Sequence, residues 1–158
     1  MKKYTLKMQL EKTELRRIVS ICSGMTFGDL HQVIQIVFGW KDYHLHRFRV
    51  GKLVIGNYED YEEDDLPMDF RWEGELKIDL ILLNAIKVFY DYDDGDGWHI
   101  SIMVEEIENV EDFECPKLLE TYASMAQEDR GGADSLMHLD REEVDIDGLN
   151  LILEHTFE

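Results

Sequence analysis

Apolar and polar side chains alternate strictly in residues 3–10, where every even position is apolar and every odd position is polar. This two-residue period is typical of a strand with one buried face. A second strand is expected at residues 15–21, close enough to the first to pair with it in the antiparallel direction. The chain therefore opens with two predicted neighbouring strands.

The period then changes to that of a helix over the stretch "TFGDLHQVIQIVFGW". Thr26 is a suitable N-cap for this helix, and Gly39 is a suitable residue to end it. The apolar positions that share one helical face are Phe27, Leu30, Val33, Ile34, Val37 and Phe38.

Two hairpins are predicted in the middle of the chain. The first joins residues 44–50 to residues 53–55 through Gly51 and Lys52, and the second joins residues 86–93 to residues 98–106. The acidic stretch "NYEDYEEDDLPMD" between them is typical of a solvated loop. The segment "LKIDLILL" fits either a short helix or a strand.

Two more helices are predicted towards the C-terminus. In "CPKLLETYASMAQEDRGGADS" one helical face would carry Leu118, Leu119, Tyr122, Met125 and Ala126.

The last helix has Ile146, Leu149 and Leu153 at helical spacing, with Asp145 or Asp147 as its cap. The order of all these elements predicts an α+β fold, with a mostly antiparallel sheet and helices packed on it, in a single domain over residues 1–158.

The net charge of the chain indicates which classes of macromolecule it can bind. Thirty-five acidic and 16 basic residues give a formal net charge of -19, which repels phosphate backbones and anionic membrane surfaces. We therefore expect no direct nucleic-acid binding and no membrane association, and a basic protein as the fitting partner. No signal-peptide or transmembrane pattern is visible, so a cytoplasmic location is expected.

Cys22 and Cys115 are the two cysteines of the chain. They lie far apart and in no C-x-x-C pattern, which indicates neither a disulfide framework nor a thiolate zinc site. We expect two buried free thiols.

The stretch "YDYDDGDGWHI" at residues 90–100 is the most concentrated group of acidic residues beside a histidine. It lacks the outer ligands of an EF-hand, so that kind of calcium site is excluded. The apolar alternation on both sides requires a turn with an odd number of residues, and Gly95–Gly97 with Gly97 left-handed meets this requirement. That register would place Asp93 opposite His99 and Asp91 opposite Ser101.

Histidines suggest a metal site near this turn. His44 and His46 form an H-x-H pair whose side chains leave a strand in the same direction, as in zinc sites. If the two hairpins adjoin, His44, His46, Asp93 and His99 could converge on a divalent metal. The alternative is that such histidines pack in the core, hydrogen-bonded to backbone or carboxylate groups.

Aromatic residues provide a third kind of candidate site. A groove for a peptide or a small apolar ligand could be lined by Trp40, Tyr43, Trp72, Tyr90, Tyr92 and Trp98. The competing interpretation places these side chains in the core. Signatures of a nucleophilic serine or of a phosphate-binding loop are missing from the sequence.

Three segments resemble the plasmid pRi Orf-three-like family, also labelled insertion-element passenger proteins. They are "TFGDLHQVIQIVFGWKDYHLHRF", "FYDYDDGDGWHISI" and "CPKLLETYASMAQEDRGG". Leu118 stands where the family often has Cys, and Ala126 and Gln127 stand where it has two prolines. The resemblance covers most of the chain and implies a single α+β domain, but no established reaction.

The leading hypothesis from the sequence is a non-enzymatic acidic binding or accessory module for a basic protein. The alternative is a metal-binding protein or metal-dependent enzyme centred on His44, His46, His99 and Asp93. A DNA-recombination accessory role, suggested by the passenger label, ranks third.

Overall fold

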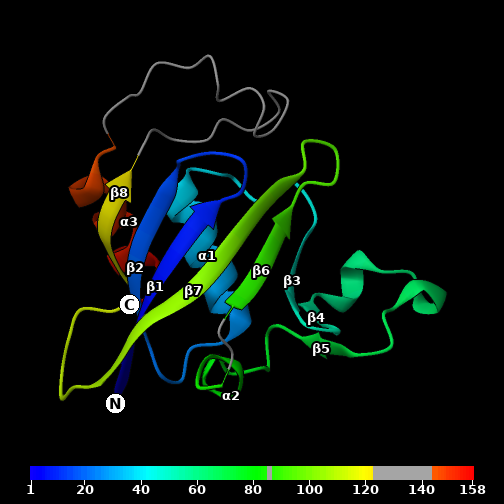
Figure 1. Cartoon of the computed structure of the whole chain (residues 1–158), viewed down its shortest axis with the longest axis horizontal. Helices are drawn as coiled ribbons and strands as arrows, with labels where there is room; N and C mark the ends of the chain where they lie inside the picture. The colour runs from blue at the N-terminus through cyan, green and yellow to red at the C-terminus, as the bar shows by residue number, and fades with distance from the viewer. Residues whose placement is uncertain (85–86, 123–143) are drawn as a thin grey trace.

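The computed structural model describes residues 1–84, 87–122 and 144–158. Eight strands in these residues form one sheet in the order β5-β4-β3-β6-β7-β1-β2-β8 (Figure 1). Neighbouring strands are antiparallel except β4 and β5, which run parallel. The strands are β1 (Lys2–Leu10), β2 (Arg16–Cys22), β3 (His46–Val50), β4 (Leu53–Gly56), β5 (Phe70–Trp72), β6 (Lys87–Tyr92), β7 (Trp98–Asn109) and β8 (Lys117–Tyr122).

Three helices in the described ranges accompany the sheet, which confirms the α+β architecture. They are α1 (Phe27–Phe38), α2 (Asp79–Leu82) and α3 (Ile146–Thr156), and two short 3-10 turns lie at Tyr58–Asp60 and Glu63–Asp65. Figure 1 shows α1 behind the central strands, with α3 beside β8 at one end of the sheet and the segment between β4 and β5 extending at the other. No helix in the described ranges is long and apolar enough to cross a membrane.

The core lies between α1 and one face of the sheet. Each even residue of β1 from Tyr4 to Leu10 has no exposed surface, as the alternation predicts. The α1 face that contains Phe27, Leu30 and Ile34 is buried against these strands. Thr26 caps α1 in a reciprocal arrangement with Asp29, and left-handed Gly39 ends it at φ 76°. The predicted boundaries of this helix are therefore confirmed.

Arg17 fastens β2 to the C-terminal end of α1. Its side chain is fully buried, and Nε donates a hydrogen bond to the Val37 carbonyl at 2.9 Å. Burial lowers the pKa of Arg17 to about 10. A guanidinium beside the last carbonyls of a helix also complements the helix dipole, so this contact holds α1 in place on the sheet.

The segment at Lys117–Tyr122 corrects one prediction, because it is a strand and not a helix. It pairs with β2 from Arg16 opposite Tyr122 to Ser20 opposite Lys117. Leu118 is buried, whereas Leu119 and Tyr122 are more than one third exposed. The open edge of β2 supplies backbone partners that outweigh the helical spacing of the leucines. Met125 and Ala126 lie outside the described residues.

The other predicted elements agree with the structure. Asp145 caps α3, with its side chain accepting a hydrogen bond from the Gly148 amide. The choice that the sequence left open at residues 76–83 is decided in favour of a short helix, α2. Both central hairpins form, with β3 paired to β4 and β6 paired to β7.

The two cysteines form a disulfide, so the prediction of free thiols is wrong. Cys22 and Cys115 are 93 residues apart in sequence, and their Cα atoms are 6.1 Å apart. The bridge ties the end of β2 to the segment that enters β8. Pairing of β2 with β8 brings the two residues together, and no local sequence signal reports that pairing.

Thiol titration of the denatured, unreduced protein should detect no free thiol, and two thiols per chain after reduction. Reduction should lower the free energy of unfolding by about 2–4 kcal/mol, because a long loop in the unfolded chain is released. Chemical denaturation with and without reductant measures this difference. Two free thiols before reduction would contradict the bridge; since disulfides are rare in reducing cytosol, the titration also bears on the expected cellular location.

Candidate functional site

The turn after β6 has an odd number of residues, as predicted, but it pairs the strands in a different register. Tyr92 faces Trp98 and Asp91 faces His99, so the turn spans residues 93–97. Gly97 is left-handed, as predicted, with φ 70°. Asp93 is also left-handed, at φ 61°, and its carboxylate accepts a hydrogen bond from the Gly95 amide. These contacts begin the turn two residues earlier than expected, and the predicted pair of Asp93 with His99 is wrong.

The four residues expected to bind a metal are consequently divided among three places. His44 Nε2 lies 3.5 Å from Asp93 Oδ2, so these two remain together. His46 Nε2 lies 2.8 Å from a carboxylate oxygen of Glu73. His99 Nδ1 lies 2.7 Å from Asp91 Oδ1. Both side chains point away from the core, because successive residues of β6 and β7 face opposite sides of the sheet.

A different pair of histidines meets on the helix side of the sheet. His31 from α1 stacks on His46 at the start of β3, with ring centroids 3.4 Å apart and planes inclined by 9°. Asp42 Oδ1 lies 3.0 Å from His31 Nε2. Within the described ranges, His31, Asp42 and His46 each offer a ligand atom, and these atoms all lie within 4.8 Å of one another.

Glu73 completes this group from the segment after β5. Its backbone amide donates to the Gly56 carbonyl, and its carbonyl accepts from the Gly28 amide in the first turn of α1, both at 2.9 Å. The side chain is nearly buried, and its two oxygens lie 2.8 and 3.0 Å from His46 Nε2. The stretch from α1 to β3 and the segment after β5 therefore bring two imidazoles and two carboxylates together.

A chain of hydrogen bonds orients His31 from behind. The side-chain oxygen Oε1 of Gln35 accepts a hydrogen bond from the Asp42 backbone amide at 2.8 Å. The side-chain nitrogen Nε2 therefore faces Tyr90 and donates to its hydroxyl at 2.9 Å. The Tyr90 oxygen lies 2.8 Å from His31 Nδ1. Tyr90 then donates its own proton to Nδ1, and His31 carries its proton on Nε2 towards Asp42.

Local sequence explains how these groups reach one place. His31 and Gln35 are four residues apart, one helical turn, on the buried side of α1. Asp42 takes a left-handed conformation at φ 57°, which Asp tolerates better than most residues, and this turns the chain from α1 into β3. Burial opposes ionisation of Asp42, but the hydrogen bond from His31 outweighs it and lowers the pKa of Asp42.

Tyr90 stays a neutral phenol in this network. It has no exposed surface, and burial raises its pKa well above the ordinary value. The side chain of Asp42, in contrast, is 56% exposed, so the group is open to solvent on the Asp42 side.

The opposite face of the sheet carries a cluster centred on Asp91. Arg47 Nε and Arg49 Nε both donate to Asp91 Oδ2, at 3.0 and 2.6 Å, and His99 binds the other oxygen. Burial opposes the charge on Asp91, but the hydrogen bonds from Arg49, His99 and Arg47 outweigh it and lower the pKa of Asp91. This cluster keeps a nearly buried carboxylate ionised.

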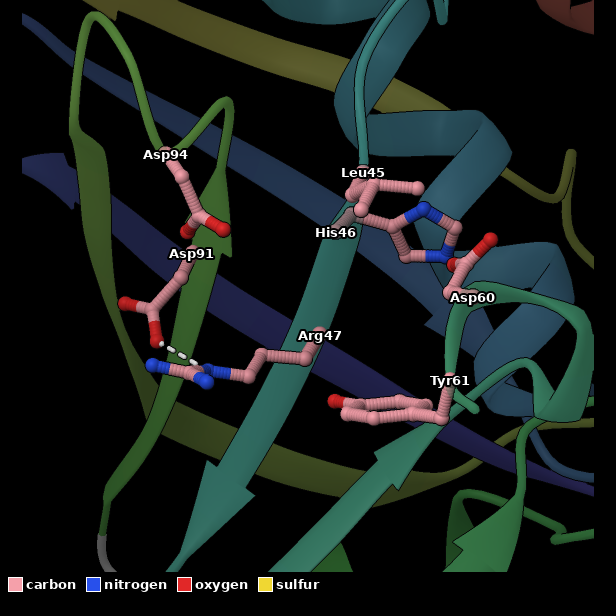
Figure 2. Close-up of a pocket in the computed structure, with 7 residues that line it drawn as sticks. All are labelled: Leu45, His46, Arg47, Asp60, Tyr61, Asp91 and Asp94. Atoms are coloured by element: carbon pink, nitrogen blue, oxygen red, sulfur yellow. Dashed lines mark hydrogen bonds and ion pairs between the residues drawn. The ribbon is translucent and has the colours of Figure 1, made fainter. Parts of the chain in front are cut away.

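A small cavity of about 100 Å³ lies between the two groups, at the start of β3. Figure 2 shows His46 and Asp60 on one side, Asp91 and Asp94 on the other, and the Arg47 side chain reaching from β3 to Asp91. The Tyr61 ring lines the cavity beside Arg47.

The expected aromatic groove is not formed, because most of its residues belong to the core. Trp40, Tyr90, Tyr92 and Trp98 are each at most 5% exposed, whereas Tyr43 is 68% exposed. The Trp40 ring packs on Tyr92 with centroids 4.9 Å apart, and it lies 5.4 Å from Trp98. Trp72, on β5, is 40% exposed.

Residues 2–142 match the family described as plasmid pRiA4b ORF-3-like protein. The chain belongs to this family. Within the ORF-3-like family motif, the first segment supplies His31, Gln35, Asp42 and His46, and the second supplies Tyr90. The convergence described above is therefore built largely from motif residues.

Two similar proteins are described without a function. The uncharacterized protein y4hQ of Sinorhizobium fredii (strain NBRC 101917 / NGR234) is 35% identical over 131 residues, which is 80% of this chain and 66% of that protein, slightly less than two thirds of its length. The crystal structure of MM3350 from Methanosarcina mazei Go1, a protein of unknown function, superposes with a TM-score of 0.76 at 25% identity, covering 92% of this chain and 95% of that one. These comparisons establish the ORF-3-like fold and no specific role.

Sequence reasoning missed His31, Asp42 and Glu73 as members of one site. A signal for His31 was present, because a His and a Gln one turn apart lie among the apolar positions that face the core. Glu73 stands in a stretch crowded with acidic residues and gives no such signal.

Asp91→Asn should lower the free energy of unfolding at pH 7 by about 1–2 kcal/mol, because the charge-assisted hydrogen bonds from Arg47, Arg49 and His99 are weakened. The pKa of Asp91 is lower in the folded protein than in the unfolded chain, so its carboxylate stabilises the fold above the unfolded value of about 3.9. That contribution disappears as the pH falls through the folded pKa. Urea titrations of both proteins should therefore converge below about pH 4; a difference independent of pH would contradict this account.

Proposed function

We propose that this protein binds a divalent transition-metal ion through His31, Asp42 and His46, with Glu73 as a further ligand. The observation that carries the proposal is that ligand atoms from α1, from the loop after it and from β3 all lie within 4.8 Å of one another. The residues differ from the set expected from the sequence, but the class of function is the same as that alternative.

The distances between donor atoms suit a single ion. His31 Nε2 and Asp42 Oδ1 are 3.0 Å apart, and His46 Nε2 and Glu73 Oε2 are 2.8 Å apart. Two ligands with bonds of about 2.0–2.1 Å at right angles to each other are separated by nearly this distance. The two rings must rotate out of their stacked arrangement, because a bound ion lies near the plane of each imidazole.

Charge also supports a divalent cation. Two ionised carboxylates and two neutral imidazoles would neutralise such an ion, and a buried carboxylate such as Glu73 needs a cationic partner. The mixture of imidazole and carboxylate ligands suits zinc, iron, nickel or manganese. The strongly acidic surface attracts cations generally.

The hydrogen-bond chain behind His31 is of the kind that supports metal ligands. Ligation through Nε2 requires the proton of His31 to move to Nδ1, which then donates to the Tyr90 oxygen. Tyr90 can accept this bond together with the one from Gln35, because a phenol oxygen has two lone pairs.

A basic protein partner remains a second proposal, supported by the segment between β4 and β5. Exposed carboxylates at Glu59, Glu62, Glu63, Asp64 and Asp65 gather there, and Figure 1 shows this segment extending from the sheet. Such a surface favours basic partners through charge and speeds their association.

Zinc, nickel and manganese chlorides, each titrated into the purified protein by calorimetry, should reveal one site per chain for at least one of them. His31→Asn and His46→Asn should each weaken that binding at least tenfold, about 1.4 kcal/mol, because one of the ligands is removed. His99→Asn and His44→Asn are the matched controls and should leave the affinity unchanged. Loss of binding in the His99 variant would contradict the proposed ligands and favour the set expected from the sequence.

Tyr90→Phe should weaken metal binding by about 10–100-fold, because His31 loses the acceptor that orients it. Calorimetry with the best-bound ion measures the change, and Tyr4→Phe is a control that removes a hydroxyl bound to Asp79, away from the site. An unchanged affinity in a folded Tyr90→Phe variant would contradict the proposed role of Tyr90 in orienting His31.

A further inference from the structure

The cavity in Figure 2 holds separated charges of both signs on different walls. Arg47 and Asp91 form one wall, and Arg49, which does not line the cavity, also binds the Asp91 carboxylate, so these three groups sum to a formal charge of +1. Arg47 lines the cavity itself, and its side chain is 45% exposed. An anionic group entering from solvent can therefore reach a guanidinium there.

The remaining walls carry two carboxylates, Asp60 and Asp94. Within the part of the chain that the structure describes, neither carboxylate takes part in a hydrogen bond or ion pair. Figure 2 shows them on opposite sides of the cavity, Asp60 beside His46 and Asp94 above Asp91. A cationic group between them would meet negative charge from both sides.

The volume limits what can enter. About 100 Å³ corresponds to roughly three water molecules at their share of liquid volume, about 30 Å³ each. Pockets for larger ligands exceed about 300 Å³, so this one accepts a ligand of a few non-hydrogen atoms, or the end of a longer one.

We infer that the cavity between Arg47, Asp60 and Asp94 is a binding site for a small zwitterion of the α-amino acid class. The ligand's carboxylate pairs with Arg47, and its ammonium group lies between Asp60 and Asp94. The Tyr61 ring provides an apolar wall for a short side chain.

Ligands with one kind of charge fit less well. A simple anion would face the carboxylates of Asp60 and Asp94, and a simple cation would face Arg47. A zwitterionic α-amino acid can pair with Arg47 and with the two carboxylates at once, because its carboxylate and its ammonium group are attached to the same carbon atom. The inference does not rest on the proposed metal site, because none of these three residues is among its ligands.

The test uses the protein treated with chelator to remove metal, and three small probes: alanine, and ethylamine and propionate, which each retain one of its two charged groups. Alanine should shift backbone amide resonances around residues 47, 60 and 94 with a dissociation constant of about 1 mM, as for a ligand of six non-hydrogen atoms. Ethylammonium and propionate should bind at least about tenfold more weakly.

Asp94→Asn should weaken alanine binding about tenfold, because one partner of the ammonium group loses its charge. Asp112→Asn removes the same charge from an exposed position after β7 and should leave alanine binding unchanged. The inference is overturned if alanine does not bind, if ethylammonium binds as tightly, which would indicate a site for a basic side chain, or if both variants weaken binding equally.

Discussion

The packing of α1 against one face of the sheet determines where every polar side chain near the candidate sites lies. Strands β3, β6 and β7 alternate, so Phe48, Tyr90 and Trp98 face the helix while Arg47, Asp91 and His99 face away. His46 lies on the helix side and meets His31 there. One face of the molecule therefore gathers imidazoles and carboxylates, and the other gathers arginines around a carboxylate.

The polar side chains buried between the sheet and α1 must find their hydrogen-bond partners among one another. His31, Gln35 and Tyr90 are almost inaccessible to water, so an unmet donor or acceptor among them would be costly. The bonds from the Asp42 amide through Gln35 and Tyr90 to His31, and back to the Asp42 carboxylate, give each of these side chains hydrogen-bond partners. A closed set of this kind holds ring positions firmly, which is what a metal site and a purely structural polar core both require.

Both segments of the family motif contribute to the buried hydrogen-bond ring. The first runs through α1 and into β3 and supplies His31, Gln35 and Asp42, whereas the second supplies Tyr90 together with Asp91 and Asp94. The cavity lies where the two segments approach each other, between the start of β3 and the turn after β6. A metal ion and a small ligand would therefore occupy neighbouring positions, with His46 lining both.

Local patterns in the sequence determined the strands β1 to β4, the limits of α1, the cap of α3 and the odd parity of the turn after β6, because each depends on residues close together in the chain. The tertiary structure alone decided that Asp91 faces His99, that Lys117–Tyr122 is a strand on the edge of β2, and that Cys22 meets Cys115. It also decided that His31 stacks on His46 beside Glu73, and that the tryptophans expected in a groove, except Trp72, are core. Each of these depends on partners far away in sequence, whose packing and hydrogen bonds outweigh the local preference.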